Sequence, residues 1–403
     1  MTVSNSLNIL YVGMLPPHPG GSGISWFQLL SGFVARGNRV RSLSPITAGA
    51  LGGGDALARE HPELGVRRYL VPHFYTGPNV PASDDYLVLE RREIEREMTE
   101  LIEAERPDIL ISGRETFGLH VPAVGARFGI PTVQGIRGNT AIAILKGEYP
   151  QAHAERLLAE FRRTDLLISV ARHLAEGLAG LGFGHIETIP NALDLGQFRP
   201  IPRDVDVADT LRLDADDCVV MHLSNLKAVK RPLDLVGSAE IALRSDPHLR
   251  YVVVGDGAFR EAMERECQRK RVSSRFRFVG WVEHARIPAV LSVADLVVSM
   301  SGAEGLSRVY LEAQASGRLL LASDIPPARE VVEDGVTGLL FRKGDARDLA
   351  AKTVLAARSP ELRKEIGGKA HQRVQEHGLD QAVSKYLECF GRCIRRHGMG
   401  RCG

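Results

Sequence analysis

Short apolar runs recur along the chain, and most lack the alternation of polar and apolar residues that marks a half-exposed strand. A run in which every position is apolar is typical of a strand buried on both faces, as in a parallel sheet. Glycine, proline or polar residues end these runs, and an amphipathic stretch follows many of them. The predicted strands cover residues 8–14, 38–44, 69–71, 108–112, 166–170, 187–190, 218–224, 251–254, 276–279, 296–300, 319–322 and 339–341.

Helical periodicity fills the intervals between these strands, at about residues 24–36, 86–105, 118–128, 174–181, 233–243, 287–293, 308–316 and 379–396. Strands and helices therefore alternate in both halves, which predicts an α/β protein with two doubly wound parallel sheets. A length of 403 residues also favours two domains. We place them at residues 1–190 and 191–378, with residues 379–403 as a C-terminal helix and tail.

Composition restricts the partners of the protein. Hydrophobic residues make up 44% and charged residues 25%, as in an ordinary globular protein, and a net charge of +2 gives no reason to expect a nucleic-acid partner. No run of eighteen apolar residues predicts a membrane span, and the N-terminus resembles a first strand more than a signal peptide. Five scattered cysteines suggest reduced thiols and a cytoplasmic location.

The richest candidate chemistry lies in residues 301–317, directly after the apolar run 296–300. The segment begins as a glycine-containing loop and continues as a helix for which Ser307 is a suitable N-cap. The first free N–H groups of that helix belong to Arg308, Val309 and Tyr310. Because they lie at the positive end of the helix dipole, they suit a phosphate group.

Two carboxylates, Glu304 and Glu312, flank this helix start. They would repel a phosphate, so we expect them to accept hydrogen bonds from nearby hydroxyls. A sugar joined to a nucleoside diphosphate offers hydroxyls at both ends of its pyrophosphate. The simpler interpretation is a surface loop whose glutamates are stabilised by the helix dipole, and for an arbitrary pair of glutamates at this spacing we would favour it.

A cluster of cations precedes another helix in the second half. Lys227, Lys230 and Arg231 follow the strand 218–224, and Pro232 suits the first turn of the next helix. Three cations at a helix start could neutralise a pyrophosphate, although a Lys-Arg cluster is more often a solvated surface.

The first half begins with a strand, a glycine-rich loop that contains Gly20, Gly21, Ser22 and Gly23, and a helix. This order is that of a Rossmann-like unit, but the loop matches no specific nucleotide motif. Glycine allows the backbone to approach a ligand closely, and a plain tight turn is the equally weighted alternative.

Residues 131–139 form a further strand end with polar residues. Gln134 can donate and accept hydrogen bonds but cannot act as a general base. Arg137 and Asn139 follow it and are candidates to contact an acceptor or a phosphate. Capping of a neighbouring helix is the competing role for Arg137.

The spacing of Glu304 and Glu312, followed by alanine and a small-residue turn, resembles the acidic motif of retaining nucleotide-sugar glycosyltransferases of the GT-B fold, the group 1 or family 4-like enzymes. The resemblance covers about residues 8–385 and is stronger in the second half. It implies two Rossmann-like domains facing a central cleft. The first would hold the acceptor, the second would hold the donor, and a C-terminal helix would cross back to the first domain.

The resemblance also assigns roles to residues. Glu304 would contact the donor sugar, Glu312 the ribose and Lys230 the diphosphate. Ser224-Asn225 stands where relatives have Gly-Arg, and Lys227 is a candidate substitute for that arginine. Gln134 stands where many relatives have histidine, so catalysis would depend on positioning and on the leaving phosphate rather than on a protein base. The full set of expected contacts is Glu304, Lys230 and Gln134 as catalytic residues, Gly21, Ser22, Asn225, Lys227, Lys230, Trp281, Val282, Glu304, Arg308, Val309 and Glu312 on the donor side, and Arg137 and Asn139 on the acceptor side.

We therefore expect a retaining glycosyltransferase that needs no metal or other cofactor and transfers a sugar to a glycan, a lipid-linked acceptor or a small molecule. A non-catalytic nucleotide-sugar-binding module, a phosphorylase and an epimerase are the alternatives. The basic end of the chain, with Arg392, Arg395, Arg396 and Arg401, is a candidate contact with anionic lipid at the inner membrane face, although a solvated tail is favoured. The sugar, the base, the acceptor, the linkage and the oligomeric state stay open.

Overall fold

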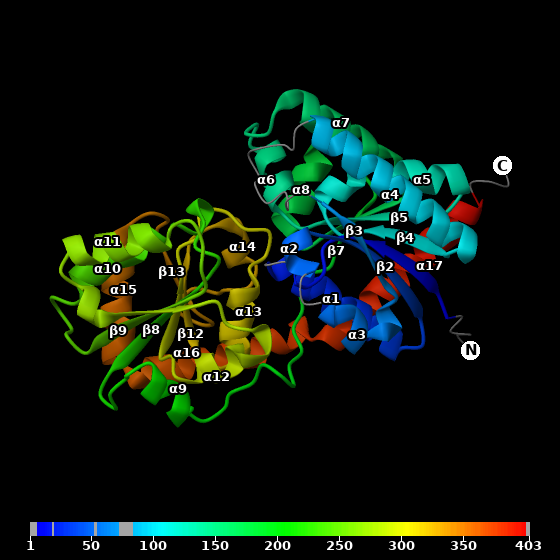
Figure 1. The fold of residues 1–403 in the computed structure, drawn as a ribbon. Helices are drawn as coiled ribbons and strands as arrows, with labels where there is room; N and C mark the ends of the chain where they lie inside the picture. The colour runs from blue at the N-terminus through cyan, green and yellow to red at the C-terminus, as the bar shows by residue number, and fades with distance from the viewer. Residues whose placement is uncertain (1–5, 18–19, 52–54, 72–83, 400–403) are drawn as a thin grey trace. The chain divides into compact units, whose positions relative to one another are not determined.

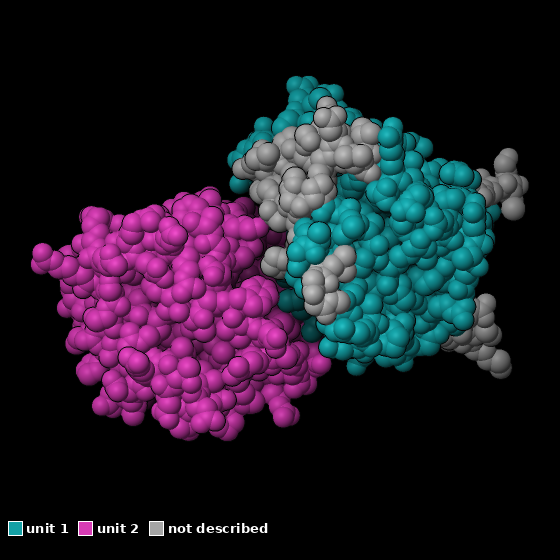
Figure 2. Space-filling view, viewed as in Figure 1, with its two compact units in different colours: residues 1–191, 379–403 teal, residues 192–378 magenta. Residues whose placement is uncertain are grey.

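The computed structural model describes residues 6–17, 20–51, 55–71 and 84–399. The chain divides into two compact units, which we call unit 1 (Met1–Asn191 with Leu379–Gly403) and unit 2 (Ala192–Gly378). Figure 2 distinguishes them by colour. Each unit contains one parallel sheet flanked by helices (Figure 1), so the predicted fold class is confirmed.

Unit 1 is built on a seven-stranded parallel sheet. Its strands are β1 (Asn8–Val12), β2 (Arg39–Ile46), β3 (Val66–Leu70), β4 (Ile109–Ser112), β5 (Thr132–Ile136), β6 (Leu166–Ser169) and β7 (Ile186–Thr188). Their order across the sheet is β3-β2-β1-β4-β5-β6-β7, and Ile9 of β1 lies between Val40 and Ile109. All residues of β4 and β5 are buried, although β4 ends in Ser112 and β5 contains Thr132 and Gln134.

The helices of unit 1 follow the strands in the usual alternation. They are α1 (Gly21–Ala35), α2 (Ala48–Leu51), α3 (Ala56–Glu60), α4 (Asp84–Ala104), α5 (Val121–Phe128), α6 (Asn139–Leu145), α7 (Gln151–Arg163), α8 (Arg172–Gly180) and α17 (Leu379–Met399), with the short 3-10 turns η1 (Pro62–Leu64) and η2 (Glu115–Leu119).

The C-terminal helix α17 packs against α1 of the same unit. Its contact is aromatic, because Trp26 and Phe33 of α1 meet Tyr386 and Phe390 of α17 with ring centroids 5.5–6.1 Å apart. All four side chains are buried. The apolar face of the last helix therefore completes the core of unit 1.

Unit 2 is built on a six-stranded parallel sheet. Its strands are β8 (Cys218–Leu223), β9 (Leu249–Val254), β10 (Phe276–Gly280), β11 (Leu296–Ser299), β12 (Leu319–Ser323) and β13 (Leu339–Phe341). Its helices are α9 (Val205–Thr210), α10 (Pro232–Ala242), α11 (Arg260–Arg269), α12 (Ile287–Ser292), α13 (Arg308–Ala315), α14 (Pro326–Arg329), α15 (Ala346–Arg358) and α16 (Pro360–Arg373), with the 3-10 turns η3 (Ala228–Lys230), η4 (Ser273–Arg275), η5 (His284–Arg286) and η6 (Val374–His377).

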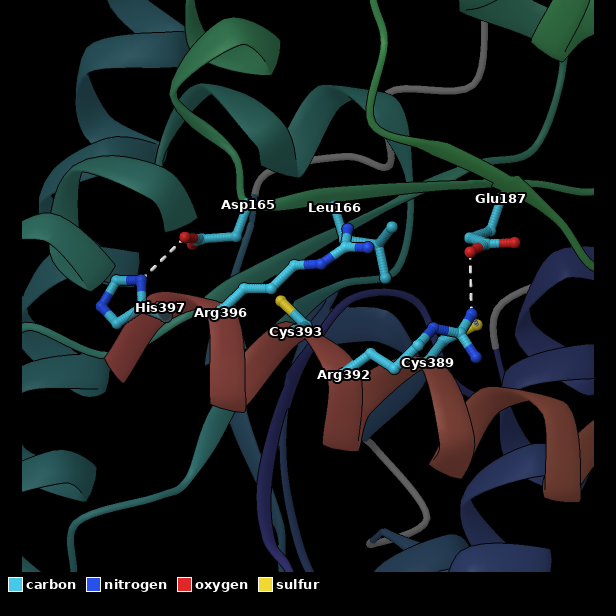
Figure 3. A pocket seen from close by; sticks show the side chains of 8 residues that line it. All are labelled: Asp165, Leu166, Glu187, Cys389, Arg392, Cys393, Arg396 and His397. Carbon is cyan, nitrogen blue, oxygen red and sulfur yellow. Dashed lines mark hydrogen bonds and ion pairs between the residues drawn. The ribbon is translucent and has the colours of Figure 1, made fainter. Parts of the chain in front are cut away.

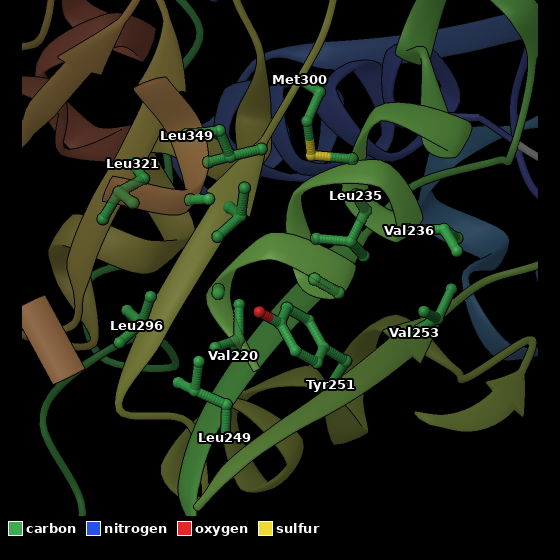
Figure 4. Packing of buried hydrophobic residues seen from close by; sticks show 14 of the residues in the cluster. Val220, Leu235, Val236, Leu249, Tyr251, Val253, Leu296, Met300, Leu321 and Leu349 are labelled. Carbon is green, nitrogen blue, oxygen red and sulfur yellow. The ribbon is translucent and has the colours of Figure 1, made fainter. Parts of the chain in front are cut away.

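One apolar cluster fills the space between this sheet and its helices (Figure 4). Val220 on β8 and Tyr251 on β9 pack under Leu235 of α10, and Leu349 of α15 belongs to the same cluster. These residues are at most 1% exposed. The cluster holds the carboxyl ends of the central strands in a fixed register.

In both sheets the chain adds strands first on one side of the unit's first strand and then on the other. The strand order is β3-β2-β1-β4 in unit 1 and β10-β9-β8-β11 in unit 2. The chain leaves β8 toward one side of the sheet and later returns to add β11 on the other side. Loops after two such strands diverge and leave a crevice where doubly wound proteins bind ligands. In unit 2 this position lies between the loops after β8 and β11.

Some boundaries differ from those that the periodicity predicts. Helix α1 begins at Gly21 rather than near residue 24, because residues 21–23 of the glycine-rich loop already have helical backbone geometry. Helices α2, α3, α6, α7, α9, α15 and α16 were not predicted from the periodicity. Within the described ranges, no helix has both the length and the apolar character needed to cross a membrane.

The contact between α1 and α17 can be tested by truncating Phe390, which is fully buried. We expect Phe390→Ala to lower the free energy of unfolding of unit 1 by about 3–5 kcal/mol, because it removes buried surface and leaves a cavity. Urea-induced unfolding measures this change. Arg395→Ala, which removes an exposed side chain from the same helix, should change it by less than about 0.5 kcal/mol. Equal midpoints for the two variants would contradict the assignment of α17 to the core.

Candidate functional site

The loops after β8 and β11 meet at the carboxyl edge of the sheet in unit 2. The N–H group of Gly302 donates a hydrogen bond to the carbonyl oxygen of Val229, at 2.7 Å. The ammonium group of Lys230 forms an ion pair with Glu304, and the Ser301 hydroxyl donates to Oε1 of the same carboxylate at 2.6 Å. The candidate cation and the candidate acid, which are far apart in the sequence, are therefore direct neighbours.

Helix α13 starts beside this pair. Its N-cap residue Ser307 has extended backbone geometry but makes no capping hydrogen bond through its side chain. The first-turn N–H groups of Arg308, Val309 and Tyr310 thus keep the arrangement that the sequence predicts for an anion. The positive end of the helix dipole and Lys230 act in the same direction, since both favour negative charge at this edge.

Glu312 lies in the middle of α13 and is 5% exposed. Its Oε1 atom is 3.1 Å from Nε2 of His284 and 3.4 Å from Nε of Arg308. Burial by itself raises the pKa of Glu312, but the hydrogen bond from His284 and the positive charge of Arg308 together outweigh it. The pKa of Glu312 therefore lies below its ordinary value, and the buried group is a carboxylate.

His222 lies on β8 beneath the cationic loop and is 1% exposed. Its Nδ1 atom is 2.9 Å from the carbonyl oxygen of Val298, so it donates there, and Nε2 accepts from the Ser224 hydroxyl at 2.8 Å. Burial lowers the pKa of His222 to about 4, and the nearby Lys230 charge adds to this effect. The imidazole is therefore a neutral support, and it adds no charge beneath Lys230.

The turns after β9 and β10 form the neighbouring part of the edge. Gly280 has a φ of 79°, and its carbonyl oxygen accepts a hydrogen bond from the N–H group of Gly255 at 2.7 Å. Gly255 has a φ of 110° and lies against the backbone of Ser224, so no other residue fits there. Trp281 is 60% exposed, and Val282 follows it. Both expected contacts therefore directly follow the turn at Gly280.

Two further donor-side candidates also lie at this edge. Lys227 is the N-cap residue of η3, the short turn that ends at Lys230. The Oδ1 atom of Asn225 is buried and has no hydrogen-bond partner among the residues that the structure describes. Asn225 carries no charge, so the positive charge in this loop comes from Lys227, Lys230 and Arg231, and Arg231 already pairs with Asp234 at 2.6 Å.

Opposite charges at this edge neutralise one another. Lys230 pairs with Glu304, and Arg308 pairs with Glu312. A ligand that combines a diphosphate with hydroxyl groups can exchange these partners, because phosphate oxygens accept from the cations and hydroxyls donate to the carboxylates. A ligand with only one of these features would leave a partly buried charge without a partner.

Gln134 does not lie where we expected a catalytic residue. Its side chain is fully buried and packs against Gly118 of unit 1. Its Nε2 atom donates to the carbonyl oxygen of Gly135 at 2.6 Å. No surface of this side chain is available to a substrate, so its expected catalytic role is not supported by its position. The local pattern could not reveal this, because buried and exposed glutamine look alike in the sequence.

Arg137 is held within unit 1 rather than presented as a free cation. Its Nη2 atom donates to Oδ1 of Asn191 at 2.7 Å, and its guanidinium lies 5.7 Å from the ring centroid of Trp26. Burial raises the pKa of the Tyr386 hydroxyl, and the charge of Arg137 opposes this rise. Arg137 thus connects β5 with Asn191 and α17, which favours a structural role over the expected acceptor contact.

Glu115 on η2 is a buried residue that the sequence did not single out. Its Oε1 atom accepts from the N–H groups of Arg137 and Gly138, at 2.9 and 2.7 Å. It thereby fixes the loop that leads to Asn139, the exposed first residue of α6. No local pattern identified Glu115, because its partners lie more than twenty residues further along the chain.

Gly21 and Ser22 form the first turn of α1 in unit 1. Gly21 is exposed and Ser22 is half-buried. The N-cap residue is Gly20, which has no side chain that could cap the helix. The start of this fifteen-residue helix therefore presents N–H groups at the carboxyl end of β1. This geometry is compatible with a phosphate or an acceptor hydroxyl near Gly21 and Ser22.

A separate cavity of about 330 Å³ lies in unit 1, between α17 and the edge of the sheet (Figure 3). Arg392 pairs with Glu187 at 2.7 Å, and His397 pairs with Asp165 at 2.7 Å. Both contacts are thus internal to the unit. Part of the basic end that we considered for lipid contact is engaged here, and Arg401 lies outside the described residues.

Comparison with known proteins agrees with this geometry. A family model described as Glycosyl transferases group 1 matches residues 208–373, and a second, described as Glycosyltransferase Family 4, matches residues 19–197. Together the two models extend over both units.

Solved structures show the same fold. HepE from Anabaena in complex with UDP and glucose is similar with a TM-score of 0.78 and 18% identity, over 96% of this chain and 100% of that chain. Sucrose-phosphate synthase from Thermosynechococcus elongatus is similar with a TM-score of 0.79 and 19% identity, over 96% and 100%. At these identities the similarity shows the fold, which is the GT-B fold.

Curated relatives match part of the chain. The D-inositol 3-phosphate glycosyltransferase of Nocardia farcinica is 33% identical over 49% of this chain and 44% of its own length. The N-acetyl-alpha-D-glucosaminyl L-malate synthase of Bacillus anthracis is 28% identical over 45% and 48%. The chain thus spans about half the length of these relatives. The two family models together match most of this chain, so it belongs to the family 4-like, group 1 glycosyltransferases, as the sequence predicted.

The neutral state of His222 predicts a pH dependence of stability. The pKa of His222 is about 4 in the folded state and about 6.5 in an unfolded chain, so only the unfolded chain gains a proton between these values. The free energy of unfolding of unit 2 should therefore fall as the pH is lowered from 6.5 to 4, by up to about 3 kcal/mol from this residue.

His222→Asn removes the titrating group and keeps a hydrogen-bond donor. We expect urea-induced unfolding of this variant to lose less stability than the parent protein between pH 7 and pH 4.5. His153→Asn in unit 1 is the matched control for the change of residue type. Parallel pH profiles for the parent and the His222→Asn variant would show that His222 is not the group responsible.

Proposed function

We propose that this protein is a retaining glycosyltransferase that transfers a sugar from a nucleoside diphosphate to an acceptor during the synthesis of a glycan or glycoconjugate. The observation that carries the proposal is the cluster at the carboxyl edge of unit 2. There Lys230, Glu304 and the start of α13 lie together at the reversal point of the strand order. This combination suits a ligand with both phosphate and hydroxyl groups.

The donor would be bound by exchange of ionic partners. The diphosphate would accept from the first N–H groups of α13, from Lys230 and from Lys227, while Asn225 would be a neutral contact at that end. Glu304 would then accept from hydroxyls of the donor sugar and Glu312 from the ribose. The backbone at Trp281 and Val282 would pair with the base. The solved relative HepE contains UDP and glucose, which supports a donor of this class.

The reaction would take place on one face of the sugar. The bond between the anomeric carbon and the phosphate oxygen breaks, and the acceptor oxygen forms a new bond on the same side. The acceptor proton passes to the leaving phosphate, so a protein base is not required. Lys230 and the helix start would stabilise the charge of the leaving diphosphate. The burial of Gln134 agrees with a mechanism in which that residue takes no direct part.

The acceptor would be held by unit 1, near Asn139. A glycan, a lipid-linked molecule and a small molecule all satisfy the chemistry. The scattered cysteines support action in the cytoplasm, and contact with the inner membrane face would require the exposed arginines of α17. No nucleic-acid partner is proposed.

The alternative is a module that binds a nucleotide sugar without transfer, and the presence of glutamine at position 134 is the feature that favours it. Such a module would be stabilised by a donor but would release no nucleoside diphosphate with any acceptor. A phosphorylase or an epimerase would instead convert its substrate without a glycan acceptor. Product analysis with and without acceptor separates these activities.

Glu304 provides the main test. A screen of UDP-glucose, UDP-N-acetylglucosamine and GDP-mannose for thermal stabilisation first identifies the donor. We expect Glu304→Gln to lower nucleoside diphosphate release at least about 100-fold, because the sugar loses an acidic partner that orients it. Binding of the free nucleoside diphosphate should be retained or strengthened, since Lys230 loses its competing carboxylate.

Glu261→Gln is the matched control, because it removes a carboxylate from an exposed ion pair on α11. It should leave release and binding unchanged. Full activity of the Glu304→Gln variant would remove Glu304 from the mechanism. If the donor binds but neither the parent protein nor the control releases nucleoside diphosphate, the non-catalytic alternative is favoured.

The role of lysine and backbone N–H groups at the diphosphate predicts that transfer does not depend on a divalent metal. We expect dialysis against EDTA to change the rate of nucleoside diphosphate release by less than about twofold. The measurement is repeated after addition of Mg²⁺ or Mn²⁺. A loss of turnover that either ion restores would show that a metal neutralises the leaving group.

A further inference from the structure

Glu312 is held by two side chains that approach from different elements of unit 2. Arg308 lies one turn earlier on the same helix, and its contact is an i,i+4 ion pair at 3.4 Å. His284 comes from η5, after β10, and its Nε2 atom is 3.1 Å from Oε1 of Glu312. Because a carboxylate only accepts hydrogen bonds, Nε2 carries the hydrogen in this contact.

We propose that His284 is a positioning residue that holds Glu312 for contact with the ribose, and that it thereby sets a preference for ribonucleotide over 2′-deoxyribonucleotide donors. The inference rests on the proposed function, because it concerns the ribose of the nucleoside diphosphate. No part of the acidic motif contains His284, which lies twenty-eight residues before Glu312.

The contact between His284 and Glu312 is built into the fold. Phe198 is fully buried, and its ring centroid lies 5.2 Å from that of the imidazole. Nη2 of Arg308 lies 3.3 Å from Nε2 of His284, so the three polar groups form one compact cluster. The side chains of Arg308 and Glu312 are each 7% exposed, and that of His284 is 20% exposed. Water therefore has little access with which to replace a lost partner.

A carboxylate held on one oxygen by two groups has a defined orientation. The i,i+4 pair alone leaves Glu312 free to follow the rotamers of Arg308, since both residues belong to one helix. The hydrogen bond from His284 comes from a different element and removes this freedom. Accepting from adjacent ribose hydroxyls requires such a fixed direction, because each hydrogen bond weakens steeply with misalignment.

The position of His284 also couples two parts of nucleoside recognition. Only Glu283 separates it from Val282, whose backbone we assign to the base, and all of these residues belong to the segment after β10. One short segment would thus pair with the base and orient the acid that contacts the ribose. Displacement of His284 should consequently affect the sugar of the nucleoside more than its phosphates, which Lys230 and α13 would bind.

The test compares ribo- and deoxyribonucleotides by calorimetry. UDP, GDP and ADP are titrated first, and the one that binds most tightly is compared with its 2′-deoxy form. We expect the parent protein to prefer the ribonucleotide by at least about tenfold, and His284→Ala to reduce this ratio to about twofold or less. Affinity for the deoxyribonucleotide should change by less than about threefold. His284→Gln, which restores an N–H donor, should recover most of the preference.

Two controls separate positioning from damage to the fold. Arg286→Ala removes an exposed side chain from the same 3-10 turn and should leave the ratio unchanged. In a double-mutant cycle, His284→Ala should have no further effect on the ratio once Glu312→Gln is present. Thermal unfolding of each variant shows whether unit 2 is intact.

The possible outcomes distinguish this inference from the proposed function. A His284→Ala variant that binds and keeps the full ribonucleotide preference overturns the inference and leaves the proposed function standing. The inference also fails, with the proposed function again unaffected, if the effect of His284→Ala persists unchanged in the Glu312→Gln background. Failure of the parent protein to bind any of the three nucleoside diphosphates overturns both.

Discussion

Parallel pairing of β8 with β11 is the constraint on which the candidate site depends. It places the carboxyl ends of two strands side by side, although the strands are separated in the chain by β9 and β10. The hydrogen bond from Gly302 to Val229 then joins the loops that follow them. Lys230 and Glu304 form their ion pair because the sheet brings their backbones together, and the apolar cluster beneath keeps that edge in register.

The ionic pairs of the site also explain how several partly buried charges can lie together at one edge of the sheet. Lys230 with Glu304 and Arg308 with Glu312 leave no large excess of either sign. An unpaired charge in a partly buried position would cost several kcal/mol, so each acid stabilises the cation that a diphosphate would later need. The neutral His222 beneath the loop fits this arrangement, because a charge there would add to those of Lys227, Lys230 and Arg231.

Much of the donor side could be predicted from local sequence. The apolar run before residue 301, the loop and the N-cap Ser307 defined a strand, a turn and a helix start, and the structure contains all three. The acceptor side was less predictable. Gln134 and Arg137 have polar side chains at a strand end, yet one packs against Gly118 and the other is engaged by Asn191. Polar residues at such positions satisfy either a ligand or the fold, and spacing alone does not distinguish the two.

The sequence by itself determined the alternation of strands and helices, and so the two parallel sheets, because buried strands and amphipathic helices leave distinct periodic patterns. It also indicated that Glu304 lies in the loop before α13 and that Glu312 lies about one turn inside this helix. Only the tertiary structure decided that Lys230 lies against Glu304, that His284 orients Glu312 and that Glu115 anchors the loop before Asn139. These contacts join residues between 22 and 74 positions apart, and side-chain direction and strand order, which local pattern does not encode, bring them together.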